Sequence, residues 1–168
     1  MTENELRACE FLTENNIEYT YYEHEAAVTM ELCDLIDMKT GAYHCKNLFM
    51  TNRAKTLFYL VLMLPHRRFK TAEVSKKLGV SRLSFADDEL LFKRMGLMPG
   101  AVTPLGLLND AEHVINVAVD KALLESEYIC IHPMVSTASL KLKTCEMLRF
   151  IRILGYEPKL IELINQDE

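Results

Sequence analysis

The chain has 168 residues, of which 49% are hydrophobic and 26% charged, and its formal net charge is −5. A chain of this length can bury a core without disulfides or metal ions, so we expect one compact domain over residues 1–168. The acidic balance argues against a general nucleic-acid binder, and the longest apolar run, residues 57–64, is too short for a membrane helix of about 20 residues.

The first half of the chain mixes helix and strand patterns. Thr2 and Glu5 have the spacing of a capping box, which predicts a helix that buries Leu6, Cys9 and Leu12. The aromatic run at 19–22 predicts a strand, and a short helix is expected from Thr29, with Leu32, Leu35 and Ile36 on its apolar side. Strands are expected at 43–50 and 57–64 with a polar turn between them, and the second, apolar throughout, has the pattern of a central strand.

The second half begins with two helices, expected at 72–78 and 88–95, each followed by a glycine suited to a C-terminal cap. Residues 97–110 are expected to form a loop, followed by strands at 114–119, 128–131 and 138–142. A last helix is expected from Thr144 to Gly155, with Met147, Leu148, Ile151 and Leu154 buried. Because strands and helices are interspersed without strict alternation, we predict an α/β domain with a strongly curved mixed sheet and helices outside it.

The cellular compartment follows from the first residues and the cysteines. The chain opens with Met1-Thr2-Glu3-Asn4-Glu5, which lacks the basic start of a signal peptide. Its five cysteines are scattered, and none has the close spacing of a zinc or redox motif. We therefore expect a cytoplasmic protein with reduced thiols, no bound metal and no cofactor.

Charge is unevenly distributed along the chain. Residues 1–37 contain ten acidic side chains against the single base Arg7, whereas residues 67–82 contain six basic side chains against the single acid Glu73. This asymmetry allows one basic face on an acidic protein. A solvated surface explains the same run of charges, and the sequence alone leaves both interpretations open.

Three short segments could carry chemistry. Lys46 lies in a predicted strand, where it shares a face with Leu48 and Met50, so its amine must reach water or hold an anion; an edge-strand lysine that prevents aggregation is the alternative. The loop Gly100-Ala101-Val102-Thr103-Pro104 has a glycine that lets the backbone approach a ligand and a proline that stiffens the exit, although a plain turn has the same residues. His132 could bind or relay a proton, or simply be hydrogen-bonded in place.

The common enzyme signatures are missing from the sequence. It contains no phosphate-binding glycine loop, no nucleophile elbow and no His-Glu-x-x-His. Cys45 has His44 beside it, but neighbours on a strand point to opposite faces, so this pair is poor evidence for a catalytic thiol.

Taken together, the segments resemble the YbaK/ProX family, the relatives of the editing domain of bacterial prolyl-tRNA synthetase. The resemblance runs from about residue 20 to residue 155 and rests on five motifs in order: Lys46-Asn47-Leu48-Phe49, Leu60-Val61, Arg82-Leu83-Ser84-Phe85-Ala86, the loop 100–104 with Gly106-Leu107-Leu108-Asn109-Asp110, and His132-Pro133. The chain is most similar to the free-standing alanyl-tRNA(Pro) deacylases of that family.

The resemblance implies a curved mixed sheet of barrel-like form, ringed by helices, and hydrolysis of the ester between an amino acid and the terminal adenosine of tRNA(Pro). It makes Lys46 the residue that holds the terminal nucleotide and Gly100, with Val102 and Pro104, the loop that lines the aminoacyl pocket. His132 corresponds to a pocket histidine, and weaker correspondences in the pocket wall are Met30, Asn109 and Met134. Many members have asparagine where this chain has Ser136, which changes the polar contacts at that end of the pocket.

The expected partner is the acceptor end of tRNA(Pro) charged with a small amino acid, with prolyl-tRNA synthetase as a further candidate partner. Arg67, Arg68 and Lys70 are the basic residues expected to touch the tRNA. An aminoacyl ester is already activated, so positioning and fixed dipoles suffice without a strong nucleophile. The alternatives left open are cysteinyl- or seryl-tRNA(Pro) as substrate, and a non-catalytic module that senses aminoacyl-tRNA or an amino acid.

Overall fold

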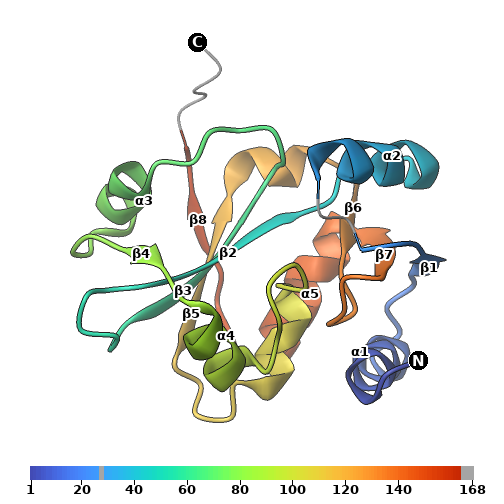
Figure 1. Ribbon diagram of the computed structural model, residues 1–168, viewed down its shortest axis with the longest axis horizontal. Coiled ribbons are helices and arrows are strands. Elements are labelled where there is room, and N and C mark those ends of the chain that lie inside the picture. The colour runs from blue at the N-terminus through green and yellow to red at the C-terminus, as the bar shows by residue number, and fades with distance from the viewer. Residues whose placement is uncertain (27–28, 164–168) are drawn as a thin grey trace.

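The computed structural model describes residues 1–26 and 29–163 (Figure 1). Five α-helices are found in this part of the chain: α1 Glu3–Glu14, α2 Met30–Thr40, α3 Thr71–Leu78, α4 Asp88–Met95 and α5 Thr144–Ile153. Two short 3₁₀ helices, η1 Pro104–Asn109 and η2 Lys121–Glu125, complete the helical content. None of the helices in the described ranges has the length and apolar character needed to cross a membrane.

The strands form two sheets. The larger has the order β4-β2-β3-β5-β8, from β4 Ser84–Phe85, β2 Lys46–Thr51, β3 Phe58–Met63, β5 Ile115–Asp120 and β8 Lys159–Ile161. It is mixed, because β2 pairs antiparallel with β3 and β4, whereas β5 runs parallel to both β3 and β8. The smaller is antiparallel and has the order β1-β7-β6, from β1 Thr20–Glu23, β7 Ala138–Lys143 and β6 Tyr128–Ile131.

A single parallel bridge between His44 and Cys130 links the two sheets just before β2 begins. The backbone N–H of Cys45 donates to the carbonyl of Cys130 over 2.8 Å, which fixes this junction. Lys46 and His132 each lie two residues beyond the bridge on the two linked segments. The start of β2 and the end of β6 therefore come together, although they are far apart in the sequence.

Strand β3 is the centre of the larger sheet, as its continuous apolarity predicted. Its alternate side chains enter two separate cores: Leu60 and Leu62 join the main cluster, with α1, α4 and α5, while Val61 and Met63 join a smaller cluster beneath α3. Burial on both faces explains why this strand has no polar alternation. The prediction of a mixed α/β fold with external helices is confirmed, with the strands divided between two sheets rather than one continuous curved sheet.

Several local predictions are confirmed and others need correction. Thr2 caps α1 with the complete capping box to Glu5, and Gly79 and Gly96 end α3 and α4 in left-handed conformations. Leu6, however, is 49% exposed, because the buried face of α1 is turned toward Ala8, Cys9 and Leu12. Leu35 is 61% exposed, so α2 does not bury the side that the spacing predicted.

The expected loop at 97–110 contains η1, in which Thr103 caps the helix and Pro104 occupies the first turn. Strands β4 and β8 were not predicted, because two or three residues are too few to show a periodic pattern.

Candidate functional site

Lys46 is the first residue of β2 and is half-buried. Strand alternation places it on the face of Leu48 and Met50, which pack in the cluster beneath α3. Its Nζ donates to the carbonyl oxygen of Arg67 over 3.4 Å, a long hydrogen bond that holds the amine weakly. Strand β4 pairs with β2 only at Met50 and Thr51, so this β4 edge does not cover the end of β2 that carries Lys46.

Asn47 connects the start of β2 to the loop 100–104. Its Nδ2 donates to the carbonyl oxygen of Cys45 and to that of Val102, each over 3.0 Å. Because Asn47 neighbours Lys46 on a strand, the loop is tied to the opposite face of β2 from the lysine. The sequence motif contained Asn47, but we assigned it no role, since a contact across 55 positions has no local signal.

The loop 100–104 lies against the segment that follows β6. Gly100 has φ +86°, a left-handed conformation that favours glycine, and a methyl group added there would lie 3.8 Å from Cβ of Ser136. Met134 on that segment is buried and also left-handed, with φ 66°. Gly100 itself is exposed, whereas Pro104 is buried at the start of η1. The structure thus brings Gly100, Val102 and Ser136 to the end of β2 where Lys46 begins.

His132 directly follows β6, and its imidazole is largely buried. Its Nδ1 lies 2.9 Å from the carbonyl oxygen of Ala138, which can only accept, so Nδ1 carries the proton and Nε2 remains an acceptor. Burial lowers the pKa of His132, despite the opposing effect of the Ala138 carbonyl, and nearby His24 and His44 lower it further. The ring is therefore neutral at pH 7 and can accept a hydrogen bond but supplies no positive charge.

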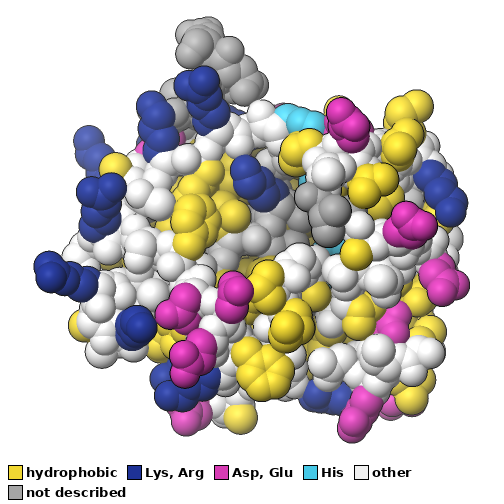
Figure 2. Space-filling view, viewed as in Figure 1, with side chains coloured by type: hydrophobic (Ala, Val, Ile, Leu, Met, Phe, Trp, Pro, Cys, Tyr) yellow, Lys and Arg dark blue, Asp and Glu magenta, His cyan; other side chains and the backbone are white. Residues whose placement is uncertain are grey.

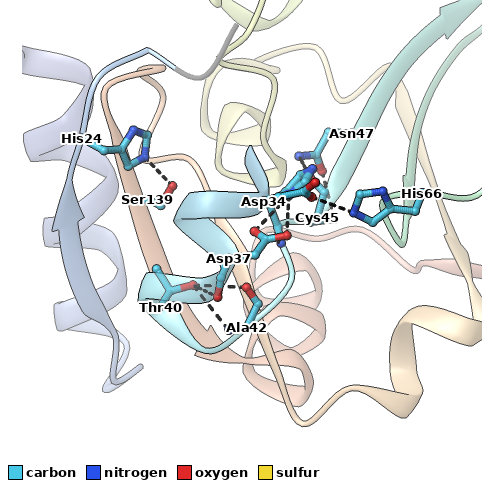
Figure 3. Close-up of polar contacts among 10 residues, drawn as sticks. His24, Asp34, Asp37, Thr40, Ala42, Cys45, Asn47, His66 and Ser139 are labelled. Carbon is cyan, nitrogen blue, oxygen red and sulfur yellow. Dashed lines mark hydrogen bonds and ion pairs between the residues drawn. The ribbon is translucent and has the colours of Figure 1, made fainter. Parts of the chain in front are cut away.

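His24 lies near His132, with their ring centroids 6.4 Å apart. Its Nδ1 lies 2.6 Å from the carbonyl oxygen of Glu25 and its Nε2 lies 2.7 Å from Oγ of Ser139. Figure 3 shows His24, directly after β1, turned toward Ser139 on β7. The sequence analysis assigned neither residue a role, because an isolated histidine has no motif spacing that marks it.

Cys45 has the properties of a core residue and not those of a nucleophile. It is buried, its Sγ lies 3.3 Å from Oδ1 of Asn47, and burial raises the pKa of its thiol to about 12. His44 does not activate it, since the His44 ring is held by Asp37 with Nδ1 3.0 Å from both carboxylate oxygens. The thiol stays protonated at neutral pH, in agreement with the sequence argument against a catalytic Cys45.

Two of the weaker expected pocket residues have other contacts. Asn109 donates from Nδ2 to the carbonyl of Met95 over 2.8 Å and accepts from Arg7 over 2.8 Å. Its side-chain amide is therefore hydrogen-bonded to the last residue of α4. Met30 is the first residue of α2 and is 52% exposed. Among the described residues, the side chains of both lack a hydrogen bond to Lys46 or to the loop 100–104, and their assignment to the pocket wall stays a prediction.

The three basic residues expected to touch tRNA differ in their surroundings. Arg67 is engaged within the protein, with one guanidinium nitrogen 3.1 Å from Oδ2 of Asp120 and the other donating to the carbonyl of Leu163 over 2.8 Å. Arg68 and Lys70 are exposed in the segment that leads to α3. Figure 2 shows basic side chains gathered along the edge of the molecule that carries α3, and a hollow near the middle of the same face.

A separate group of metal-ligating types lies on α2 and the loop after β3. Asp34, Asp37 and His66 each present a ligand atom, and these atoms all lie within 4.8 Å of one another. Asp34 and Asp37 also line a cavity of about 570 Å³ between α2 and the start of β6, together with Met38, Tyr43, Glu127 and Tyr128. The sequence predicted no metal site, because these residues have no recognisable ligand spacing.

Comparison with known proteins identifies the family. Residues 24–150 match the family model described as the aminoacyl-tRNA editing domain. The chain is 32% identical over 152 residues to the prolyl-tRNA editing protein ProX of Acetoanaerobium sticklandii, covering 90% of this chain and 93% of that one. It is 30% identical over 155 residues to the prolyl-tRNA synthetase associated domain-containing protein 1 of Danio rerio, covering 90% and 83%.

The fold is also similar to that of a solved structure. The crystal structure of a candidate trans-editing enzyme for prolyl tRNA synthetase superposes with a TM-score of 0.74 at 16% identity, over 98% of this chain and 99% of that one. The chain belongs to the aminoacyl-tRNA editing domain family. The resemblance drawn from the five sequence motifs is thereby confirmed.

Proposed function

We propose that this protein hydrolyses the ester bond of mischarged aminoacyl-tRNA(Pro) in the cytoplasm, and that alanine is the amino acid it removes. One observation carries the proposal: Asn47 ties the loop 100–104 to the start of β2, next to Lys46, while Gly100 lies against Ser136. The Lys46 amine lies on one face at the start of β2, and the loop, exposed at Gly100, is tied to the other face. The neutral imidazole of His132 follows β6, which the bridge between His44 and Cys130 joins to the segment before β2. The name of the ProX relative supports prolyl-tRNA editing as the activity.

The chemistry proposed for these groups is positioning and charge stabilisation. Lys46 binds phosphate or ribose oxygens of the terminal adenosine. Its amine is available for this because its hydrogen bond to the carbonyl of Arg67 is long and weak, and a substrate oxygen can replace that carbonyl. Backbone groups of the loop 100–104 orient the ester and the attacking water. His132, neutral with Nε2 free to accept, contacts the ribose hydroxyl or the α-amino group. No protein nucleophile is needed, in keeping with the protonated thiol of Cys45.

The preference for alanine rests on size selection. One methylene is worth about 1–3 kcal/mol in an apolar pocket, so a pocket that fits alanine excludes prolyl esters by steric clash rather than by affinity alone. Met134 and Pro104 are buried, and we propose that their side chains limit the space beside Gly100. Ser136 adds a hydroxyl in place of the asparagine found in many members, and we propose that it is compatible with a small, uncharged side chain.

A panel of tRNA(Pro) charged with alanine, cysteine, serine or proline tests the proposal directly. We expect the purified protein to hydrolyse alanyl-tRNA(Pro) at least about 10-fold faster than the cysteinyl and seryl esters, with prolyl-tRNA(Pro) left intact. Faster release of cysteine or serine would reassign the substrate. Binding of charged tRNA without turnover of any ester would instead indicate a sensing module.

We further propose that the tRNA approaches along the side of β2 that faces α3. Lys46, Leu48 and Met50 share that face, and Phe69 of the segment before α3 packs against the same cluster. Arg68 and Lys70 flank Phe69 and are exposed, which suits contact with phosphates of the acceptor end. Arg67 is left out of this surface, because Asp120 already neutralises its guanidinium.

The salt dependence of binding tests this approach. The double variant Arg68→Ala/Lys70→Ala should weaken tRNA binding and reduce the slope of log affinity against log salt by about 1.4, since each phosphate contact on single-stranded nucleic acid contributes ~0.7. Lys93→Ala/Lys143→Ala, which removes two exposed lysines from α4 and from the residue before α5, is the matched control and should leave the slope unchanged. Equal slopes for the wild type and the first variant would remove Arg68 and Lys70 from the interface.

A further inference from the structure

We infer that Asp34, Asp37 and His66 form a binding site for a divalent transition-metal ion, best matched by Zn²⁺, on the side of α2 that faces the loop after β3. Asp34 and Asp37 are three residues apart on one helix and therefore project from the same face. His66 reaches them from the loop between β3 and α3, and Figure 3 shows its ring turned toward Asp34. The site contains no residue of the loop 100–104 and none of the groups proposed to contact the ester.

The geometry is close to that of a bound metal. Nε2 of His66 lies 3.0 Å from Oδ1 of Asp34, and the ligand atoms of all three residues lie within 4.8 Å of one another. Ligands at about 2.0–2.2 Å from one zinc ion lie no more than about 4.4 Å apart, so closure needs a shift of a few tenths of an ångström. The side chains of His66 and Asp34 are 46% and 51% exposed, which leaves them free to make that shift.

The backbone and a fourth side chain orient the ligands. His66 has φ 66°, a left-handed conformation that a residue with a side chain seldom adopts and that aims its ring at α2. The carboxylate of Asp37 accepts from the backbone N–H of His44 over 3.1 Å, and Nδ1 of His44 lies 3.0 Å from both of its oxygens. Such a partner behind a ligating carboxylate is what supports a metal ligand in many known sites.

The ligand types select the metal. Two carboxylate oxygens with one imidazole nitrogen suit Zn²⁺ better than Ca²⁺ or Mg²⁺, which prefer oxygen ligands alone. Three protein ligands leave one position for water or for a small donor. Asp34 and Asp37, but not His66, also line the cavity of about 570 Å³. In the described part of the chain, both carboxylates pair with histidines rather than with lysine or arginine.

The position of the site indicates its consequence. His66 precedes Arg67, whose carbonyl accepts from Lys46 and whose guanidinium is held by Asp120. An ion bound at His66 restrains the backbone at this point and so restrains the partner of the Lys46 amine. The metal therefore acts as a local brace that stabilises the folded chain when it binds.

Isothermal titration of the full chain, freed of metal by a chelator and then dialysed, tests the site with Zn²⁺ as the probe. We expect one Zn²⁺ per chain and a rise in Tm on binding, with His66→Ala and Asp34→Asn each weakening the affinity by about 10-fold or more. Glu31→Gln, which removes an exposed carboxylate from the same helix, is the matched control and should bind as the wild type does.

Cys33 is a nearby alternative ligand, and Co²⁺ distinguishes it. A site made of carboxylates and imidazole gives a cobalt spectrum without a thiolate charge-transfer band, and Cys33→Ser should bind Zn²⁺ normally. The inference is overturned if Zn²⁺ fails to bind, if His66→Ala binds as tightly as the wild type, or if binding is lost in Cys33→Ser. None of these measurements uses tRNA, so their failure would leave the proposed deacylase activity untouched.

Discussion

Replacing Lys46 with alanine should reduce hydrolysis of alanyl-tRNA(Pro) by about 100-fold to 1,000-fold in single-turnover kcat/KM, the range that follows loss of a preorganised charge-stabilising group. The amine is half-buried at the first residue of β2, and its one hydrogen bond among the described residues, to the carbonyl of Arg67, is 3.4 Å long. A group so loosely held is available for an anionic substrate. Its removal should leave the fold intact, which circular dichroism and Tm can verify.

Two further variants separate charge from geometry at Lys46. Lys46→Arg keeps the positive charge but replaces a compact ammonium with a planar fork, so we expect activity between that of the wild type and that of Lys46→Ala. Lys93→Ala removes an exposed lysine from α4 and should leave the rate unchanged. A rate for Lys46→Ala within about twofold of the wild type would contradict the proposed role. Rising KM with constant kcat would place the amine in substrate binding alone.

The sequence predicted those parts of the fold that depend on local pattern. Each of the confirmed signals involves residues close together in the sequence: the capping box at Thr2, the glycine caps after α3 and α4, and the apolar run that becomes β3. Strand β8 has no such signal. Lys159 and Leu160 are exposed, and the strand exists because its backbone pairs with Ala118 and Val119 of distant β5. Pairing across the sheet, rather than propensity, determines such a short strand.

The candidate site was likewise predicted only in part from the sequence. Family motifs pointed to Lys46, the loop 100–104 and His132. The bridge between His44 and Cys130 joins the segments that carry Lys46 and His132, and Asn47 joins the loop to β2. The side chains that join them were not predictable from spacing. Asn47 reaches the carbonyl of Val102 across 55 positions, and Asp34 meets His66 across a hairpin and a helix. These contacts depend on tertiary packing, for which a single sequence gives no periodic signature.

Arg67→Ala should destabilise the protein by about 3–5 kcal/mol, because it leaves the carboxylate of Asp120 buried without its cation. The Asp120 side chain is 1% exposed and that of Arg67 16% exposed, so solvent screens their 3.1 Å ion pair poorly. The same guanidinium also donates to the carbonyl of Leu163 beyond β8, which joins the segment before α3 to the end of the described chain. Urea denaturation of the variant measures the loss as a lower midpoint.

Neutralising the remaining acid should recover part of that stability. Arg67→Ala/Asp120→Asn keeps the shape of the side chain and its acceptor for the backbone N–H of Ala122, but removes the unpaired charge, so we expect it to be more stable than Arg67→Ala alone. Arg68→Ala, an exposed neighbour, should change the free energy of unfolding by no more than about 0.5 kcal/mol. If Arg67→Ala and Arg68→Ala were equally stable, the pair with Asp120 would contribute nothing, and Arg67 would return to the surface proposed for tRNA. The large asymmetry we expect between these two adjacent arginines follows from burial alone, since their charge and position in the sequence are nearly the same.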